Sequence, residues 1–382
     1  MRIAIISDTH TIDSIEYIYE YIRQLVLRVN IDCFVINGDI LGINEIKKDY
    51  GYNYDRKEFY ASLNKKEILA KASPLNYEKL ILLSPKLTDL RYEEDEGHPV
   101  LEEFGKIVCD YITERYSYAA NILKKFSEVK KTFFNLGNYE SPIHYALIKE
   151  LSFLLDSDEA LIKKSILYAH APDLYMQFKE KLQGLEGKNF RYIGGKTAIE
   201  KDVLFAGIPG VNESSVPTDS ASTLQENITK ELIGAIKRQL SYANKLILFN
   251  HTEGRITKSP FTFRPGSASV REFIQEMKNN KIRQKVFVQS HYHWITTHFY
   301  TMDDFFFVLN NSGVNNCIFN ILELSNKIKC FDVDPKNNLI RELKTYDSYI
   351  SDYSKPESRL SLNYDNPGEI IAQRNLNNCY YM

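Results

Sequence analysis

Residues 2–10 read RIAIISDTH, an apolar run that ends directly before Asp8 and His10. A short apolar run of this kind predicts a strand that is buried on both faces. Residues 33–40 read CFVINGDI and repeat the arrangement, with Asp39 just beyond the run. A helix over residues 15–29 is the expected connection, as part of a right-handed β-α-β crossover. In open α/β sheets, sites form beyond the carboxyl ends of the strands, so these polar side chains are expected to meet.

Further candidate ligands follow later apolar runs. TFFNL precedes Asn138, KLILFN precedes His251, and KVFVQ precedes His291 and His293. The chain has only eight histidines, and four of them belong to this set. Carboxylate oxygens, imidazole nitrogens and carboxamide oxygens are the ligands that divalent cations take in proteins. The candidate metal ligands are Asp8, His10, Asp39, Asn138, His251, His291 and His293. Their order predicts a centre of two ions about 3.5–4 Å apart that share a bridging carboxylate.

The order DxH, GD, GN, H and HxH resembles the calcineurin-like metallophosphoesterase superfamily, from residue 1 to about residue 330. The resemblance implies an α/β fold, a four-layer α/β/β/α sandwich of two mixed sheets. It also implies two divalent metal ions, which the sequence leaves open as Mn²⁺, Fe²⁺ or Fe³⁺, Zn²⁺ or Ni²⁺. One ion would be held by Asp8, His10, Asp39 and His293. The other would be held by Asp39, Asn138, His251 and His291, with Asp39 as the bridge.

The sequence departs from the family pattern beside Asn138 and before His291. The family usually has GNH and an acidic residue, whereas this chain reads Gly137-Asn138-Tyr139-Glu140. Tyr139 would then replace the histidine that donates a proton to the leaving group. Its reference pKa near 10 makes it a poorer match to neutral pH. Glu140 is expected to order the loop, and Gln289-Ser290 stands where the family usually has glycine.

The expected chemistry is attack of a metal-bridging hydroxide on a phosphorus ester, with Asp39 setting the distance between the ions. Without the usual general acid, substrates with good leaving groups are favoured. We therefore expect a phosphodiesterase that acts on a nucleotide or a nucleic-acid end. The alternatives are a metal-binding scaffold with little turnover and a DNA-processing nuclease. A net charge of −2 without a dense basic stripe speaks against the nuclease. His170, in ILYAHAPD, is an alternative to His251 as a ligand.

The catalytic domain is expected to cover residues 1–334, with a helical insertion at 41–130 between the second and third ligand motifs. A long helix over 100–127 dominates this insertion, which is expected to cap the metal site and contact substrate. After Trp294 the pattern predicts hairpins that turn at 303–304 and 325–326, as parts of the second sheet. Residues 335–382 are polar and are expected to form a C-terminal arm.

Composition points to a globular cytoplasmic protein. No stretch approaches the ~20 apolar residues that a membrane span requires, and MRIAIISD leads straight into a strand without a signal peptide. The cysteines are odd in number and lack CxxC spacing, so we expect reduced, mostly buried thiols. They are Cys33, Cys109, Cys317, Cys330 and Cys379.

Overall fold

The structure is a computed structural model, and it describes much of the chain outside the expected insertion and the C-terminal region. The described residues are 1–10, 12–40, 99–137, 140, 148, 152, 158–168, 171–210, 226–251, 268–278, 280–294, 297–302, 304–311, 317–344 and 346–347. Asn138, Tyr139 and His170 lie outside them. So do residues 41–98 of the expected insertion and residues 348–382 of the expected arm.

The first sheet has seven strands in the order β13-β12-β11-β1-β2-β3-β4. Its parallel half consists of β1 (Arg2–Ile6), β2 (Cys33–Asn37), β3 (Lys131–Asn135) and β4 (Phe190–Tyr192). Its antiparallel half consists of β11 (Phe319–Leu324), β12 (Ile328–Asp334) and β13 (Leu339–Glu342). The predicted hairpin with its turn near residues 325–326 is confirmed as β11–β12.

The second sheet also has seven strands, in the order β14-β9-β10-β8-β7-β6-β5. Its parallel core consists of β6 (Val203–Ile208), β7 (Lys245–Asn250), β8 (Gln284–Trp294) and β10 (Phe305–Asn311). Towards its edges lie β5 (Thr197–Glu200), β9 (His298–Met302) and β14 (Tyr346–Asp347). The predicted hairpin at residues 303–304 is confirmed as β9–β10.

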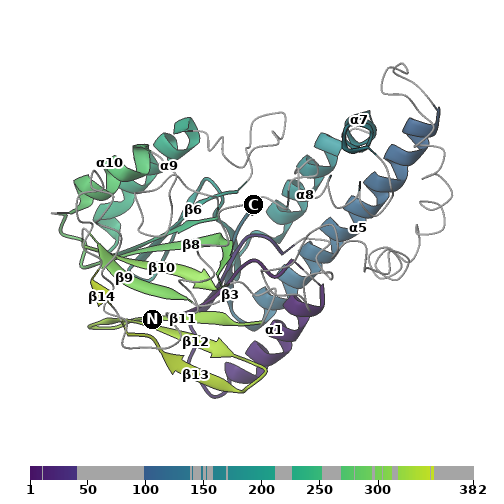
Figure 1. The fold of residues 1–382 in the computed structure, drawn as a ribbon. Coiled ribbons are helices and arrows are strands. Elements are labelled where there is room, and N and C mark those ends of the chain that lie inside the picture. The colour runs from purple at the N-terminus through teal and green to yellow at the C-terminus, as the bar shows by residue number, and fades with distance from the viewer. Residues whose placement is uncertain are drawn as a thin grey trace, which may run out of the picture.

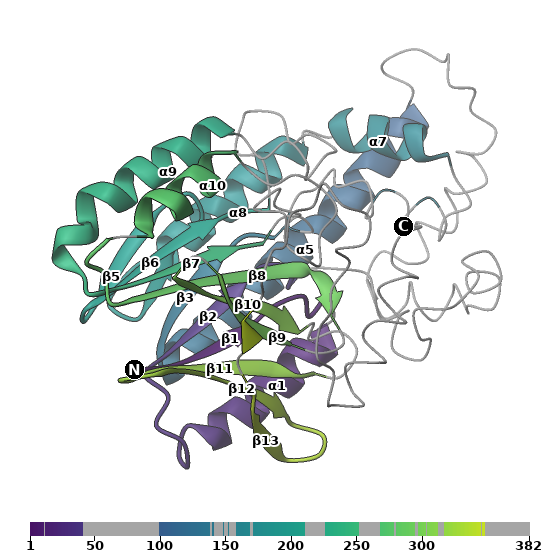
Figure 2. The same ribbon diagram turned by 60° about the vertical axis from the view of Figure 1, so that its left-hand side comes forward.

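Helices cover the outer face of each sheet (Figures 1 and 2). On the first sheet lie α1 (Ile12–Leu25), α5 (Pro99–Val129) and α8 (Ala171–Leu185), with α7 (Glu159–Tyr168) packed against α5. On the second lie α9 (Glu226–Gln239), the short η2 (Leu240–Tyr242) and α10 (Ala268–Met277). The predicted helix at 100–127 is confirmed as α5. Within the described part of the chain, no helix is long and apolar enough to cross a membrane.

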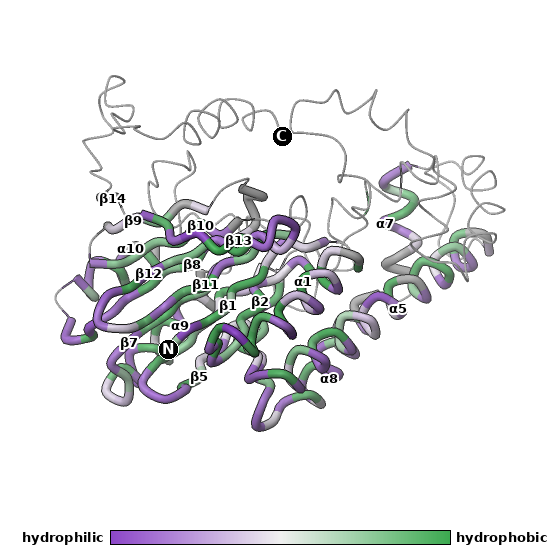
Figure 3. The backbone as a smooth tube through the Cα atoms, turned by 90° about the horizontal axis from the view of Figure 1, so that it is seen from below, coloured by the Kyte–Doolittle hydropathy of each residue, from purple (hydrophilic) through white to green (hydrophobic). Residues whose placement is uncertain are grey.

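Alternation along the central strands builds the layers. In β1, Ile3 and Ile5 pack between the two sheets, whereas Ala4 and Ile6 pack in the cluster under α1 and α5. Strands buried on both faces are apolar throughout, which is why the run RIAII shows no polar alternation. Along α5 and α8, hydrophobic and hydrophilic residues alternate as expected for helices with one buried face (Figure 3). The α/β/β/α sandwich of two mixed sheets is therefore confirmed.

The sheets continue past residue 334, where the polar arm was expected to begin. Strand β13 pairs with β12, and β14 pairs with β9. A turn joins β12 to β13, with the Asn338 backbone N–H donating to the Pro335 carbonyl (3.3 Å). All of β13 is exposed, so this edge strand buries no apolar face. For this reason its sequence carries no hydrophobic pattern that could have predicted it.

Candidate metal centre

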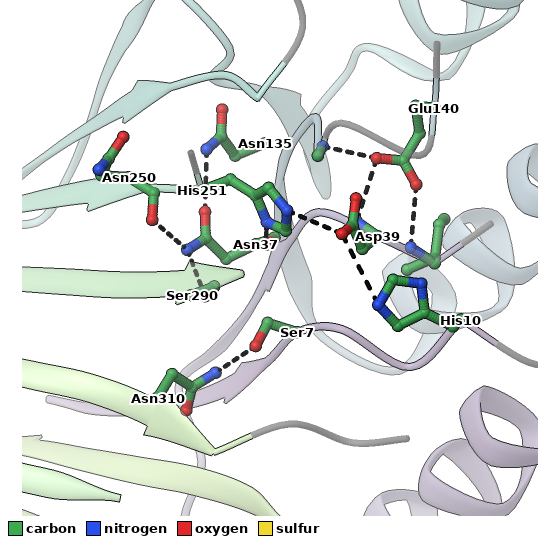
Figure 4. Close-up of polar contacts among 12 residues, drawn as sticks. Ser7, His10, Asn37, Asp39, Asn135, Glu140, Asn250, His251, Ser290 and Asn310 are labelled. Carbon is green, nitrogen blue, oxygen red and sulfur yellow. Dashed lines mark hydrogen bonds and ion pairs between the residues drawn. The ribbon is translucent and has the colours of Figure 1, made fainter. Parts of the chain in front are cut away.

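The layer between the sheets changes from apolar to polar at the carboxyl ends of the strands. Along a strand, the positions that face the other sheet lie two residues apart. The last apolar residue at such a position belongs to the core between the sheets in six strands, which are β1, β2, β3, β7, β8 and β10. The next inward position is polar and buried in each case. These positions hold Ser7, Asn37, Asn135, His251, Ser290 and Asn310. We call this set the polar floor; Figure 4 shows its members beside Asp39 and His10.

The loops after β1 and β2 are joined backbone to backbone. The Asp8 N–H donates to the Gly38 carbonyl (3.1 Å), and the His10 N–H donates to the Asp39 carbonyl (2.9 Å). Asp8, His10 and Asp39 all lie in the left-handed region, with φ of 48°, 52° and 52°. Few residues other than glycine adopt this conformation, and those that do cluster at functional sites. The strained loops bring the three side chains to one place.

Asp39 lies between two histidines. Its Oδ2 atom is 3.0 Å from Nε2 of His251 and 3.7 Å from Nε2 of His10, and all three side chains are fully buried. Asp8 joins them, because ligand atoms of Asp8, Asp39 and His251 lie within 4.8 Å of one another. Two ligand atoms that each lie about 2.1 Å from the same cation are about 3.0–3.4 Å apart when the ligand–metal–ligand angle is near 90–110°. The Asp39–His251 distance fits a shared ion.

The charges around His251 favour a cation. Burial lowers the pKa of His251, but the carboxylates of Asp39 and Asp8 and the carbonyl of Asn37 outweigh it and raise the pKa to about 10. Nδ1 lies 2.6 Å from the Asn37 carbonyl oxygen, to which it must donate. Nε2 is therefore the nitrogen that faces Asp39, in the orientation that metal-binding histidines take when a carbonyl holds their other nitrogen. The residues present thus fit a divalent ion.

Glu140 clasps the loops after β2 and β3. Its fully buried carboxylate accepts hydrogen bonds from the backbone N–H groups of Asp39 (3.0 Å), Ile40 (2.9 Å) and Gly137 (2.5 Å). Its carbonyl accepts a hydrogen bond from the hydroxyl of Tyr116 on α5 (2.7 Å), and burial raises the pKa of that hydroxyl well above its usual value. The side chain therefore fixes the backbone that presents Asp39.

Two glycines allow these loops to approach. A Cβ atom at Gly38, where φ is 79°, would lie 2.5 Å from the Gly137 Cα and 2.5 Å from His251 Nδ1. A Cβ atom at Gly137 would lie 2.1 Å from Oδ1 of Asp39. Such contacts are far inside van der Waals distance, so only glycine fits at either position.

The structure brings four of the predicted ligands together: Asp8, His10, Asp39 and His251. His291 and His293 lie at the carboxyl end of β8, directly after the buried Ser290. Asn138 and Tyr139, like the alternative ligand His170, lie outside the described residues.

The sequence carries a further signal for polar residues beside this site. The runs CFVIN, KTFFN and KLILFN each end in asparagine, and these residues are Asn37, Asn135 and Asn250. A polar residue that closes an otherwise apolar strand indicates a buried polar network at that end, because a buried polar group needs a partner.

Solved structures that are similar to this chain share little of its sequence. GAP50, the anchor in the inner membrane complex of Plasmodium, is 13% identical and aligns over 90% of this chain and 88% of its own, with a TM-score of 0.39. A putative 5′-nucleotidase from Staphylococcus aureus in complex with alpha-ketoglutarate is 12% identical, over 99% and 58%, with a TM-score of 0.37. No curated protein matches the chain.

The family assignment rests on sequence. The family described as calcineurin-like phosphoesterase matches residues 1–295, which is most of the chain. Members of this family use divalent metal ions, and the buried group of Asp8, Asp39 and His251 offers a place for one. The chain therefore belongs to the calcineurin-like phosphoesterase family and is a metal-dependent phosphoesterase.

Proposed function

We propose that this chain is a two-metal phosphodiesterase in which Asp39 bridges the ions. The observation that carries the proposal is the position of Asp39 Oδ2, 3.0 Å from the His251 imidazole and 3.7 Å from the His10 imidazole. A carboxylate that served one ion would need histidine ligands on one side only. Asp39 instead faces a histidine from each ligand set that the family pattern implies.

The proposed ligands follow strands of both sheets. Asp8, His10 and Asp39 follow β1 and β2 of the first sheet, and His293 of β8 would complete their ion. Asp39 and His251, with Asn138 and His291, would hold the other ion. When bound, the ions would act as Lewis acids toward the phosphoryl oxygens and lower the pKa of a water molecule. The chain's own part is to keep the ligands buried and fixed by Glu140 and the polar floor. A bound ion would displace the proton that the raised pKa of His251 keeps on its ring in the metal-free protein.

Tyr139 would protonate the leaving group. Its hydroxyl carries a proton at neutral pH, but a reference pKa near 10 makes it a weak acid. We therefore favour substrates whose leaving group needs little help, namely phosphodiesters or anhydrides of nucleotides and nucleic-acid ends. Replacing Tyr139 by phenylalanine should slow a diester with an alkyl leaving group much more than one with a nitrophenyl leaving group. Equal slowing of the two diesters would show that Tyr139 does not protonate the leaving group.

The insertion at 41–130 would cap the site. In its described part, α5 reaches the metal loops directly, because Tyr116 donates its hydroxyl hydrogen to the Glu140 carbonyl. A movement of α5 would therefore shift the loop that presents Asp39. A cytoplasmic location is part of the proposal too. It is supported by the described cysteines, which form no disulfide, as is usual in a reducing compartment; they are Cys33, Cys109, Cys317 and Cys330.

Hydrolysis of two model esters tests the proposed function. Metal-stripped protein would be reconstituted with Mn²⁺ and given bis-p-nitrophenyl phosphate and p-nitrophenyl phosphate, with Asp39→Asn as the inactive control. We expect turnover of the diester to exceed that of the monoester and to vanish in the variant. Preference for the monoester would overturn the diesterase. Bound metal with no turnover of either ester would favour the scaffold.

A further inference from the structure

Asn37 sits at the centre of the polar floor and uses its side chain to join strands of both sheets. Its Nδ2 group donates to the Asn250 carbonyl (3.1 Å) and to Oγ of Ser290 (2.7 Å), while its Oδ1 accepts from Nδ2 of Asn135 (2.9 Å). Its own carbonyl accepts from Nδ1 of His251 (2.6 Å). Figure 4 shows these contacts converging on Asn37.

Two partners of Asn37 directly precede candidate ligands in the sequence. Asn37 itself precedes Asp39 by two residues, Asn250 directly precedes His251, and Ser290 directly precedes His291. Asn135 extends the network to β6, because its Nδ2 group also donates to the Ile208 carbonyl (2.9 Å). Strand β2 belongs to the first sheet, whereas β7 and β8 pair with each other in the second, so no backbone ladder joins the end of β2 to the ends of the other two strands. The Asn37 side chain supplies the missing link.

Full burial makes this link stiff. Asn37, Asn135, Asn250 and Ser290 are all 0% exposed, so no water from the surface can substitute for a broken hydrogen bond. A buried polar group without its partner costs free energy, which favours the arrangement of strand ends in which the Asn37 side chain keeps its three hydrogen bonds. Side chains that orient metal ligands in this way change metal affinity by about 10–100-fold when they are removed.

Ser290 supplies a side-chain acceptor to the link. The family usually has glycine at the position before its HxH motif, and glycine offers no acceptor there. Ser290 is not among the described residues with a positive φ, so its backbone does not require glycine. Its hydroxyl instead gives Asn37 a second acceptor, and the two together tie the strand that carries His291 to the loop that carries Asp39.

We propose that Asn37, through Ser290 and Asn250, is the positioning residue that sets the affinity of the ion held by Asp39, His251 and His291, an inference that rests on the proposed two-metal function. Asn37 would touch neither metal nor substrate. It would act through the spacing of the strand ends, so its loss should weaken one of the two ions more than the other.

Mn²⁺ titration of metal-stripped protein by calorimetry tests this, with thermal unfolding of the metal-free forms as a check on folding. The variants are Asn37→Ala, Ser290→Gly and the double variant. Asn320→Ala is the matched control, because Asn320 is also fully buried and hydrogen-bonded to Thr297 (2.8 Å) and Asp332 (2.8 Å).

We expect Asn37→Ala to weaken one of two Mn²⁺ sites by about tenfold or more, and Ser290→Gly to weaken the same site to a smaller degree. The double variant should match Asn37→Ala, because Ser290 acts through Asn37. The visible spectrum of the Co²⁺-loaded protein should change at the weakened site. Asn320→Ala should lower the unfolding temperature and leave both Mn²⁺ constants unchanged.

Wild-type Mn²⁺ constants in a folded Asn37→Ala variant would overturn the positioning role and leave the two-metal function standing. If Asn37→Ala does not fold, Ser290→Gly decides in the same way. If Asn320→Ala and Asn37→Ala lowered the Mn²⁺ affinity of both sites to the same extent, Asn37 would have no positioning role beyond that of an ordinary core residue. A wild-type protein that binds no Mn²⁺ would overturn the proposed function and this inference together.

Discussion

The Nε2 atom of His251 lies 3.0 Å from the Oδ2 atom of Asp39, although the two residues follow strands of different sheets. The candidate centre therefore spans the seam of the sandwich, and it exists only while the two sheets are packed together. Metal binding should accordingly stabilise the fold as a whole, since the unfolded chain has no preformed site.

Glu140→Gln tests the clasp that presents Asp39. The amide would place an N–H group against backbone N–H groups that now donate to the carboxylate. Hydrogen bonds to a buried charged group are worth about 1.5–3 kcal/mol each, so we expect unfolding free energy to fall by at least about 2 kcal/mol. Chemical denaturation of the metal-free protein would measure this change.

The matched control for Glu140 is Glu102→Gln. Glu102 accepts from Lys106 on the exposed face of α5 (2.8 Å). Because solvent screens this pair, the control should leave the denaturation midpoint nearly unchanged. If the Glu140→Gln protein were as stable as the control, Glu140 would not stabilise the loops after β2 and β3.

Gly38→Ala tests the close approach of the ligand loops. The added Cβ would lie 2.5 Å from the Gly137 backbone in a left-handed conformation, which should cost roughly 2 kcal/mol or more. Gly184→Ala is the control, because nothing lies within 4 Å of a Cβ placed on this exposed residue of α8. That change should stabilise the protein, by up to about 1 kcal/mol. Thermal unfolding should therefore shift in opposite directions, and a common direction would contradict the geometry.

Asp32→Asn should destabilise the protein in a pH-dependent way. Asp32 accepts from the Arg2 N–H (2.7 Å) and from Lys201 Nζ (2.7 Å). Burial raises the pKa of Asp32, but these two partners outweigh it and hold the pKa below its ordinary value of 3.8. A carboxyl with a lowered folded pKa contributes stability above its ordinary value and loses it as pH falls through the folded value.

Because Lys201 is mostly exposed, we expect a loss of only about 1 kcal/mol in Asp32→Asn at pH 7. The gap to wild type should shrink as pH falls below about 4. Urea denaturation at pH 7, 5 and 3 measures it. A gap that widens toward acid would mean that the carboxyl is not held in its charged form.

Much of this architecture could be predicted because a strand that is buried on both faces has a continuous apolar sequence. Ile3 to Ile6 are apolar at every position since both faces of β1 are covered, and the ligands stand where such runs stop. The family and the fold followed from that order and are confirmed. The structure brings Asp8, His10, Asp39 and His251 together, but the ligand roles of all seven predicted residues stay predictions.

What the sequence could not give are contacts between distant segments. Glu140 meets the N–H groups of Asp39 and Ile40 across the intervening insertion, and nothing local predicts which backbone groups a buried carboxylate will find. Asn37 likewise finds Ser290 only when the sheets stack. The strand at 339–342 escaped because an exposed edge strand needs no apolar face.

The number of Mn²⁺ ions bound per chain decides whether Asp39 bridges two ions. Metal-stripped wild type and Asp39→Asn would be equilibrated with Mn²⁺, and bound metal counted after confirming by circular dichroism that both are folded. A bridging Asp39 predicts two ions in the wild type and the loss or strong weakening of both in the variant. A single ion whose affinity is unchanged by Asp39→Asn would contradict the two-metal centre.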